Sequence, residues 1–210
     1  MKTRWLGRLG YEDALALQEE IVRSKIADPA LEDELLLLEH EPVYTIGRTP
    51  DRTSLRDPAT LPFPLVTISR GGQATYHGPG QLVGYPILDL KPRGADLHRY
   101  LRGLEDLLIE VCASFGVQAG RREGLTGTWI GERKIASIGV GVRRWISLHG
   151  FALNVCGDLA PFSAITPCGL AGVEMTSLER ETGQSLTVER VAEEVARLFP
   201  THLPEPAPVC

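Results

Sequence analysis

The segment from Arg70 to Gln81 holds an unusual mixture of residues. It reads Arg-Gly-Gly-Gln-Ala-Thr-Tyr-His-Gly-Pro-Gly-Gln and sets four glycines among Arg, Gln, Thr, Tyr and His side chains. Glycine lets the backbone approach a ligand closely, and the polar neighbours can orient a carbonyl or an amide. The segment matches neither the phosphate-binding Gly-Lys-Ser/Thr loop nor the dinucleotide fingerprint. Its composition favours a binding loop, and the alternative is a turn-rich loop with a capped His77.

One of the four cysteines stands apart from the others. Cys168 lies in Thr-Pro-Cys-Gly-Leu, which is typical of a tight loop. Cys112 falls on the apolar stripe of a predicted helix, Cys156 ends a predicted strand, and Cys210 is the last residue. A thiol with the ordinary pKa of about 8.5 forms little thiolate at neutral pH, so a nucleophilic Cys168 needs a base or a cation nearby.

The candidates for that partner are His40, His77, His149 and Lys134. Lys134 begins the run Lys-Ile-Ala-Ser-Ile-Gly-Val, whose apolar and small residues can partly bury an ammonium group. Spacing alone favours the alternative, an exposed hairpin lysine, and His149 can likewise be a histidine at a strand edge. No group of His, Cys and Asp has the spacing of metal ligands, so we expect no metal.

Length and composition restrict the class of protein. The chain has 210 residues, 43% hydrophobic and 23% charged, which predicts one compact domain over residues 1–210 with a proline-rich tail from about residue 200. The formal net charge of -5 provides no global basic field for nucleic acid or an anionic membrane. No apolar run suits a signal peptide or a membrane span, and the cysteines are sparse. We therefore expect a cytoplasmic protein that binds neither nucleic acid nor membrane.

Helical periodicity marks three segments. Apolar residues recur at three-to-four-residue spacing over 11–26, 96–115 and 188–199, and Thr187 is a plausible N-cap for the last of these. Gly116 is expected to end the second helix, and Asp28-Pro29 the first. The three prolines after residue 203 predict an extended tail.

Short apolar runs indicate the strands. They cover 35–38, 43–46, the surroundings of Val66 and Ile68, and 85–88, with a predicted loop over 48–64. Residues 129–130, 135–142 and 145–155 read as antiparallel strands joined by tight turns. Helix, then clustered strands, then helix predicts an α+β fold with a mixed, mainly antiparallel central sheet flanked by helices.

Four motifs together resemble those of the lipoyl(octanoyl) transferase family. They are the segment 70–81, Gly-Glu-Arg-Lys-Ile-Ala at 131–136, His-Gly-Phe-Ala-Leu-Asn at 149–154, and Pro-Cys-Gly at 167–169. They occur in the family's order and spacing, and the resemblance runs from about Leu36 to Leu178. It implies the fold of the biotin and lipoate ligase catalytic domains, in agreement with the α+β prediction.

The resemblance also implies roles for individual residues. Cys168 would be the nucleophile that carries the acyl group as a thioester, and Lys134 the partner that lowers the pKa of its thiol. The sequence leaves open whether Lys134 acts as an ammonium or as a neutral amine. The implied acyl site consists of Arg70, Gly71, Gly72, Gln73, Ala74, Thr75, Tyr76, His77, Ser137, Ile138, Gly139, Gly150, Phe151 and Ala152.

The implied activity is transfer of an octanoyl group from acyl carrier protein to a lysine of a lipoyl domain, the first step of protein lipoylation. The implied acceptors are the lipoyl domains of 2-oxoacid dehydrogenases and the glycine cleavage H protein, and no cofactor is needed. One rival is an ATP-dependent lipoate or biotin protein ligase on the same fold, which would need no cysteine. A second is a non-catalytic protein that binds an acyl carrier without turnover.

Overall fold

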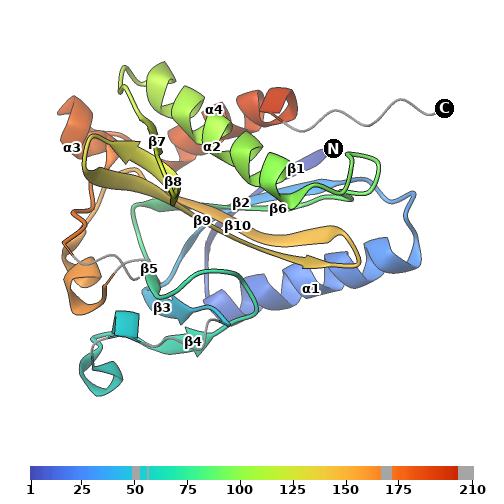
Figure 1. Ribbon diagram of the computed structural model, residues 1–210, viewed down its shortest axis with the longest axis horizontal. Helices are drawn as coiled ribbons and strands as arrows, with labels where there is room; N and C mark the ends of the chain where they lie inside the picture. Colours follow the sequence, from blue (N-terminus) through green and yellow to red (C-terminus); the bar gives the residue numbers. More distant parts are fainter. Residues whose placement is uncertain (49–52, 56, 167–171, 203–210) are drawn as a thin grey trace.

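The structure is a computed structural model that describes residues 1–48, 53–55, 57–166 and 172–202. A seven-stranded sheet in the order β1-β2-β6-β10-β9-β8-β7 forms its centre (Figure 1). Its β1–β2 pair is parallel and its other pairs are antiparallel. The predicted α+β fold with a mixed, mainly antiparallel sheet is confirmed. The strands are β1 (Lys2–Leu9), β2 (Glu34–His40), β6 (Gln81–Ile87), β7 (Gly120–Arg122), β8 (Leu125–Ile130), β9 (Arg133–Arg143) and β10 (Ile146–Asn154).

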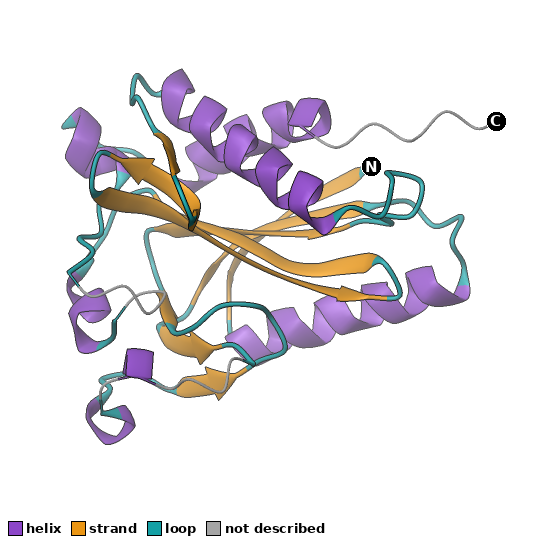
Figure 2. Cartoon of the chain, viewed as in Figure 1, coloured by secondary structure: helices purple, strands orange, loops and turns teal. Residues whose placement is uncertain are grey.

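Helices cover both faces of this sheet (Figure 2). α1 (Tyr11–Ala27) packs on one face, while α2 (Leu97–Ser114) and α4 (Val188–Leu198) pack together on the other. These bounds agree with the three predicted helices to within one residue. The side chain of Asp96 accepts a hydrogen bond from the Arg99 N–H, and Thr187 accepts one from Arg190, so both helices begin at a side-chain cap.

Strand β2 shows why the sheet needs cover on both sides. Its buried leucines alternate: Leu35 and Leu37 join the core under α2 and α4, and Leu36 and Leu38 join the core under α1. Successive strand side chains point to opposite faces, so an unbroken apolar run is typical of a strand covered twice. Each fully buried leucine contributes about 1.5–3 kcal/mol from removal of its apolar surface from water.

A second, three-stranded sheet lies beside the first. It pairs β4 (Leu65–Thr67), β3 (Val43–Ile46) and β5 (Thr75–His77). Strand β5 belongs to the Gly-rich segment, so the prediction of an uninterrupted loop there is wrong for these three residues. The predicted loop at 48–64 contains two single-turn 3-10 helices, Thr53–Leu55 and Pro58–Thr60.

Some elements have no counterpart among the predictions. They are β1, β7, α3 (Leu178–Thr182) and the 3-10 turns Ala160–Ala164 and Phe199–His202. β1 and β7 are the edge strands of the large sheet and carry Lys and Arg, as exposed edges often do, so hydrophobic periodicity does not reveal them. The predicted extended tail lies outside the described residues. None of the described helices is long and apolar enough to cross a membrane.

Candidate active site

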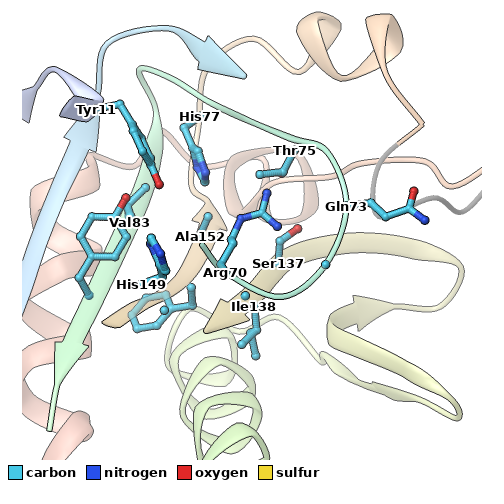
Figure 3. A pocket seen from close by; sticks show the side chains of 15 residues that line it. Tyr11, Arg70, Gln73, Thr75, His77, Val83, Ser137, Ile138, His149 and Ala152 are labelled. Atoms are coloured by element: carbon cyan, nitrogen blue, oxygen red, sulfur yellow. The ribbon is translucent and has the colours of Figure 1, made fainter. Parts of the chain in front are cut away.

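A pocket opens between the central sheet and the Gly-rich segment (Figure 3). The lining residues are Tyr11, Arg70, Gly72, Gln73, Thr75, His77, Val83, Tyr85, Ser137, Ile138, Gly139, His149, Gly150, Phe151 and Ala152.

Most residues of the predicted acyl site line this pocket, including all those on β9 and β10. Gly71, Ala74 and Tyr76 do not. The Gly71 N–H donates to the carbonyl of Val140 over 3.1 Å, which ties the Gly-rich segment to β9. Ala74 and Tyr76 are buried in the core beside the small sheet. Gly71, Ala74 and Tyr76 therefore hold the segment in place around the pocket.

The register of β9 against β10 builds the floor of the pocket. Ser137 pairs with Ala152 and Gly139 with Gly150, so two motifs distant in sequence meet on adjacent strands. A Cβ atom at Gly139 would lie 2.9 Å from Cδ of Arg70 and 3.2 Å from the Gly71 carbonyl oxygen. A glycine is needed there because the Gly-rich segment crosses β9 too closely for a side chain.

Arg70 is buried with its guanidinium at the pocket wall. Its Nη1 donates to the Gly71 carbonyl at 2.8 Å, and its Nη2 donates to the Thr45 hydroxyl at 3.0 Å and to the Thr45 carbonyl at 3.2 Å. These bonds join the segment to β3. The guanidinium also places a positive charge beside the pocket, and this charge contributes to lowering the pKa values of His77 and His149.

A chain of buried polar side chains connects the pocket with the segment after residue 172. His77 Nδ1 donates to Gln81 Oε1 at 2.7 Å, and Gln81 Nε2 donates to Asn154 Oδ1 at 3.0 Å. Asn154 Nδ2 then donates to the carbonyl of Thr176 at 3.0 Å, and the Thr176 N–H donates to the carbonyl of Lys134. Because each buried polar group is paired, this network fixes the Lys134 strand relative to the pocket.

Three histidines around the pocket are held neutral. Burial lowers the pKa of His40 to about 4. Burial, then His40, lowers the pKa of His77 to about 3. Burial, then Arg70, lowers the pKa of His149 to about 4. Tyr85 donates its hydroxyl proton to Nε2 of His40, 2.6 Å away, since Nδ1 of His40 is the donor to the Leu9 carbonyl.

Lys134 is one of the largest buried side chains of the molecule. It is 2% exposed, so the interpretation as an exposed hairpin lysine is wrong. Its Nζ donates to the Thr126 carbonyl at 3.1 Å and lies 5.1 Å from the centroid of the Trp129 ring, where a cation is attracted to the π face. A Cβ at Gly127 would lie 2.8 Å from Cε of Lys134, so this glycine makes room for the lysine.

A second cavity lies next to the first and is lined partly by Lys134. Leu97, Leu101 and Leu125 form its apolar walls. The two cavities share four of their lining residues: Gly72, Gln73, Ile138 and Gly139. The two cavities therefore adjoin at these four residues.

Cys168 lies outside the described residues, so its position relative to Lys134 stays a prediction. The chain on either side of it is described. Thr166 donates its N–H to the Ser54 carbonyl at 2.7 Å. After the gap, the carbonyl of Glu174 accepts the Lys134 N–H at 2.8 Å, and Met175 forms a parallel bridge with Lys134. The segment that follows Cys168 is thus hydrogen-bonded to the backbone of Lys134.

The two other described cysteines are poor nucleophiles. Cys112 is buried in the core, as predicted, and burial raises the pKa of its thiol to about 12. Cys156 follows β10 and is partly buried, and burial together with Glu179 and Glu39 raises the pKa of its thiol. Cys210 lies outside the described residues. Within the part of the chain that is described, no three His, Cys, Asp or Glu side chains form a group that could hold a metal ion.

Sequence reasoning missed four lining residues as part of the pocket: Tyr11, Val83, Tyr85 and His149. Tyr11 comes from the start of α1, far from the other lining residues in sequence, and only tertiary packing brings it to the pocket. The interpretation of His149 as a strand-edge residue is wrong, because β10 lies between β6 and β9 and His149 is buried.

Comparisons with known proteins agree with this geometry. The lipoyl protein ligase A/B catalytic domain model matches residues 10–200. An octanoyltransferase of Geobacter sulfurreducens is 56% identical over 95% of this chain and 83% of its own length. One of Geobacter metallireducens is 52% identical over 99% of this chain and 96% of its own length.

Solved structures share the fold at lower sequence identity. A putative lipoate protein ligase of Thermoplasma acidophilum with bound lipoic acid superposes with a TM-score of 0.74 at 20% identity, covering 97% of this chain and 86% of that one. The biotin protein ligase of Aquifex aeolicus reaches a TM-score of 0.57 at 13% identity, covering 97% and 68%. The family match and the high identity to the Geobacter enzymes place this chain in the octanoyltransferase family, within the lipoyl protein ligase A/B catalytic-domain group.

Proposed function

We propose that this octanoyltransferase moves an octanoyl group from acyl carrier protein to a lysine of a lipoyl domain by way of a thioester on Cys168. The observation that carries the proposal is the shared wall between two cavities. Ile138 and Gly139 line both the pocket beside Arg70 and the cavity of Lys134. An acyl chain in the first pocket would pass this wall and present its carbonyl carbon in the cavity that Lys134 lines.

The pocket provides a physical reason for binding a fatty chain. Each buried methylene contributes about 0.8 kcal/mol, so a chain of eight carbons gains roughly 5 kcal/mol. Val83, Ile138 and Phe151 supply apolar contacts along the wall. One methylene more or less changes binding by about 1–3 kcal/mol, so the pocket discriminates chain length modestly.

The proposed chemistry has two transfers. The thiolate of Cys168 attacks the carbonyl carbon of the donor thioester, and the tetrahedral intermediate collapses with release of the carrier-protein thiolate, which takes a proton. The lysine amine of the lipoyl domain then attacks the acyl-enzyme. An amide forms, the bond to Sγ of Cys168 breaks, and the amine proton passes to the departing sulfur. The thioester intermediate predicts ping-pong kinetics.

Covalent connection favours a role for Lys134 in both transfers. Glu174 is six positions after Cys168 in the chain, a span of at most about 21 Å. The Glu174 carbonyl accepts the hydrogen bond from the Lys134 N–H. Lys134 Nζ would stabilise the thiolate as an ammonium, or take the thiol proton as a neutral amine, and would relay the proton of the incoming lysine.

The proposed partners follow from this chemistry. The donor is octanoyl-acyl carrier protein, and the acceptors are lipoyl domains of 2-oxoacid dehydrogenases and the glycine cleavage H protein. The donor thioester already holds an activated acyl group, so the transfer needs no nucleotide. This distinguishes the proposal from the ligase alternative, in which a free acid is first activated with ATP.

Intact mass spectrometry tests the proposal. The protein is incubated with octanoyl-acyl carrier protein without ATP, and we expect one added octanoyl group that hydroxylamine removes. Cys168→Ser should abolish the hydroxylamine-sensitive adduct, and Cys156→Ser, the matched control, should retain it. Adduct formation that requires ATP and free octanoate would favour the ligase alternative.

A second measurement addresses the non-catalytic alternative. Lipoyl domain is added in tenfold excess over enzyme, and octanoylated lipoyl domain is counted over time. We expect many turnovers for each enzyme molecule and none for Cys168→Ser. A stable complex with the carrier protein and no octanoylated product would contradict the proposed function and favour an acyl-carrier binding protein.

A further inference from the structure

The side chain of His149 is an unpaired polar group within the proposed acyl pocket. It is 2% exposed, and neither ring nitrogen has a hydrogen-bond partner among the described residues. A buried polar group without a partner costs about 1–3 kcal/mol. Figure 3 shows the ring among the side chains that line the pocket. The structure thus leaves one donor and one acceptor facing a site that otherwise suits a hydrocarbon chain.

The backbone at His149 is held in an unfavourable conformation. Its φ is 58°, in the left-handed region that few residues other than glycine adopt, although His149 lies within a β-strand. The His149 N–H donates to Oε1 of Gln18 at 2.8 Å, and Gln18 is itself fully buried on α1. A residue of α1, 131 positions earlier in the sequence, therefore maintains this conformation. Such maintained strain often accompanies a functional position.

His149 lies at the end of the pocket remote from Lys134. In the β9–β10 register it pairs with Val140, six residues along β9 from Lys134. At about 3.3 Å per strand residue this is roughly 20 Å. His149 also does not line the cavity of Lys134. The shared wall at Ile138 and Gly139 lies between Lys134 and the partner of His149 along β9. An acyl chain that passes this wall with its carbonyl on the Lys134 side would thus direct its terminal carbons toward His149.

The ring is suited to a neutral hydrogen-bonding partner. The cations facing it are Arg70 and Arg48, and they disfavour a charge on the imidazole. A neutral imidazole has one N–H donor and one acceptor nitrogen. It can therefore accept a hydrogen bond from a hydroxyl group or donate one to the hydroxyl oxygen, and it offers no charge to an anion.

We propose that His149 is a specificity-determining residue that hydrogen-bonds a polar atom near the end of the acyl chain. This inference rests on the proposed acyl pocket and extends its substrate class. The pocket would take acyl groups with a hydroxyl near the eighth carbon as well as plain alkyl chains. An apolar residue in place of His149 would leave that hydroxyl buried without a partner.

Two isosteric donors test the proposal. 8-Hydroxyoctanoyl-acyl carrier protein and nonanoyl-acyl carrier protein have acyl chains of equal heavy-atom length, and only the former carries a terminal hydroxyl. The measured quantity is the ratio of kcat/KM for the hydroxylated donor to kcat/KM for the nonanoyl donor. We expect His149→Phe to lower this ratio about tenfold. Val83→Ala, which changes the pocket shape and leaves its polar groups intact, should keep the ratio within about twofold.

The ratio is insensitive to partial loss of folded protein, because both donors meet the same enzyme. If His149→Phe yields no folded protein, the wild-type chain labelled with 15N-histidine provides the second measurement. 8-Hydroxyoctanoate should shift the His149 ring-nitrogen resonances, and nonanoate should shift them less. An unchanged ratio in His149→Phe, or equal shifts with both acids, would overturn the proposal. Absence of octanoyl transfer by the wild type would instead contradict the proposed function.

Discussion

The backbone N–H of Gly127 donates a 3.0 Å hydrogen bond to Oε1 of Glu105, a buried carboxylate on α2. Gly127 in turn lies against the side chain of Lys134, and the neighbouring Thr126 carbonyl accepts from Lys134 Nζ. The second oxygen of Glu105 pairs with Arg121 and Arg102. A carboxylate in the helix layer thus positions the part of β8 that holds the proposed catalytic lysine.

We expect Gly127→Ala to impair transfer strongly. The new Cβ would lie 2.8 Å from Cε of Lys134 and 2.5 Å from the Ala136 carbonyl oxygen, and φ is +119°. The strained backbone and displaced lysine should cost about 1–3 kcal/mol of stability and at least about tenfold in transfer rate. Steady-state transfer and urea unfolding measure both effects. Gly131→Ala is the control, because φ there is also positive, at +57°, whereas a Cβ meets open space, so this variant has backbone strain without the clash with Lys134. Equal rates in the two variants would contradict the prediction.

Glu105 should act as a positioning residue. Glu105→Ala removes the acceptor of the Gly127 N–H and should lower the free energy of unfolding by about 1–3 kcal/mol, together with the transfer rate. Glu105→Gln keeps an acceptor oxygen and should retain most of the activity. The adjacent Asp106 is half-exposed and pairs with Arg121 only at the surface, so Asp106→Ala should change stability by less than about 1 kcal/mol. Activity lost equally in Ala and Gln variants would show that the charge, and not the hydrogen bond, matters.

Lys134→Ala should sharply slow alkylation of the reactive thiol at neutral pH. If Lys134 lowers the thiol pKa by one unit or more, its loss reduces the thiolate fraction about tenfold. The rate of iodoacetamide labelling against pH measures this effect, and the midpoint should move upward in the variant. Cys112→Ala should leave the rate unchanged, because the thiol of Cys112 has a pKa of about 12. An unaltered pH profile in Lys134→Ala would remove the lysine from the mechanism.

The predictable parts of the molecule are those with local signals. Helical periodicity located α1, α2 and α4, and the apolar run at 35–38 located β2, because amphipathic stripes and fully buried strands leave a pattern in neighbouring residues. Edge strand β1 has no such pattern in its sequence. Its side chains alternate between solvent and partial burial, and its place beside β2 depends on a parallel pairing across α1.

The candidate site was predictable only as separate motifs. The Gly-rich segment and the strands at 137–139 and 150–152 were identified, and the structure brings them to one pocket. Tyr11 joins that pocket from a helix whose sequence indicates only amphipathicity. Burial of Lys134 depends on Trp129 and on the space left by Gly127, which are tertiary features that spacing along one strand does not reveal.

The three neutral histidines predict that the protein loses stability in mild acid. The pKa values of His40, His77 and His149 in the folded chain are about 4, about 3 and about 4, against 6.5 for an unperturbed histidine. Below pH 6.5 the unfolded chain binds protons that the folded chain excludes, so unfolding becomes easier as pH falls toward 4. Above pH 6.5 both states are neutral and the effect is absent. Urea unfolding between pH 7 and pH 4 measures it.

Removing one of these histidines should flatten the pH dependence. His149→Asn suits the positive φ, since asparagine tolerates the left-handed region, and it eliminates one group that takes a proton on unfolding. Between pH 6 and pH 5 the slope of unfolding free energy against pH should fall by about 1.4 kcal/mol per pH unit, the value for one proton. The exposed His98 provides the matched variant, and His98→Asn should leave the slope unchanged. Equal slopes for His149→Asn and the wild type would mean that His149 already binds a proton in the folded protein, which its burial beside Arg70 opposes.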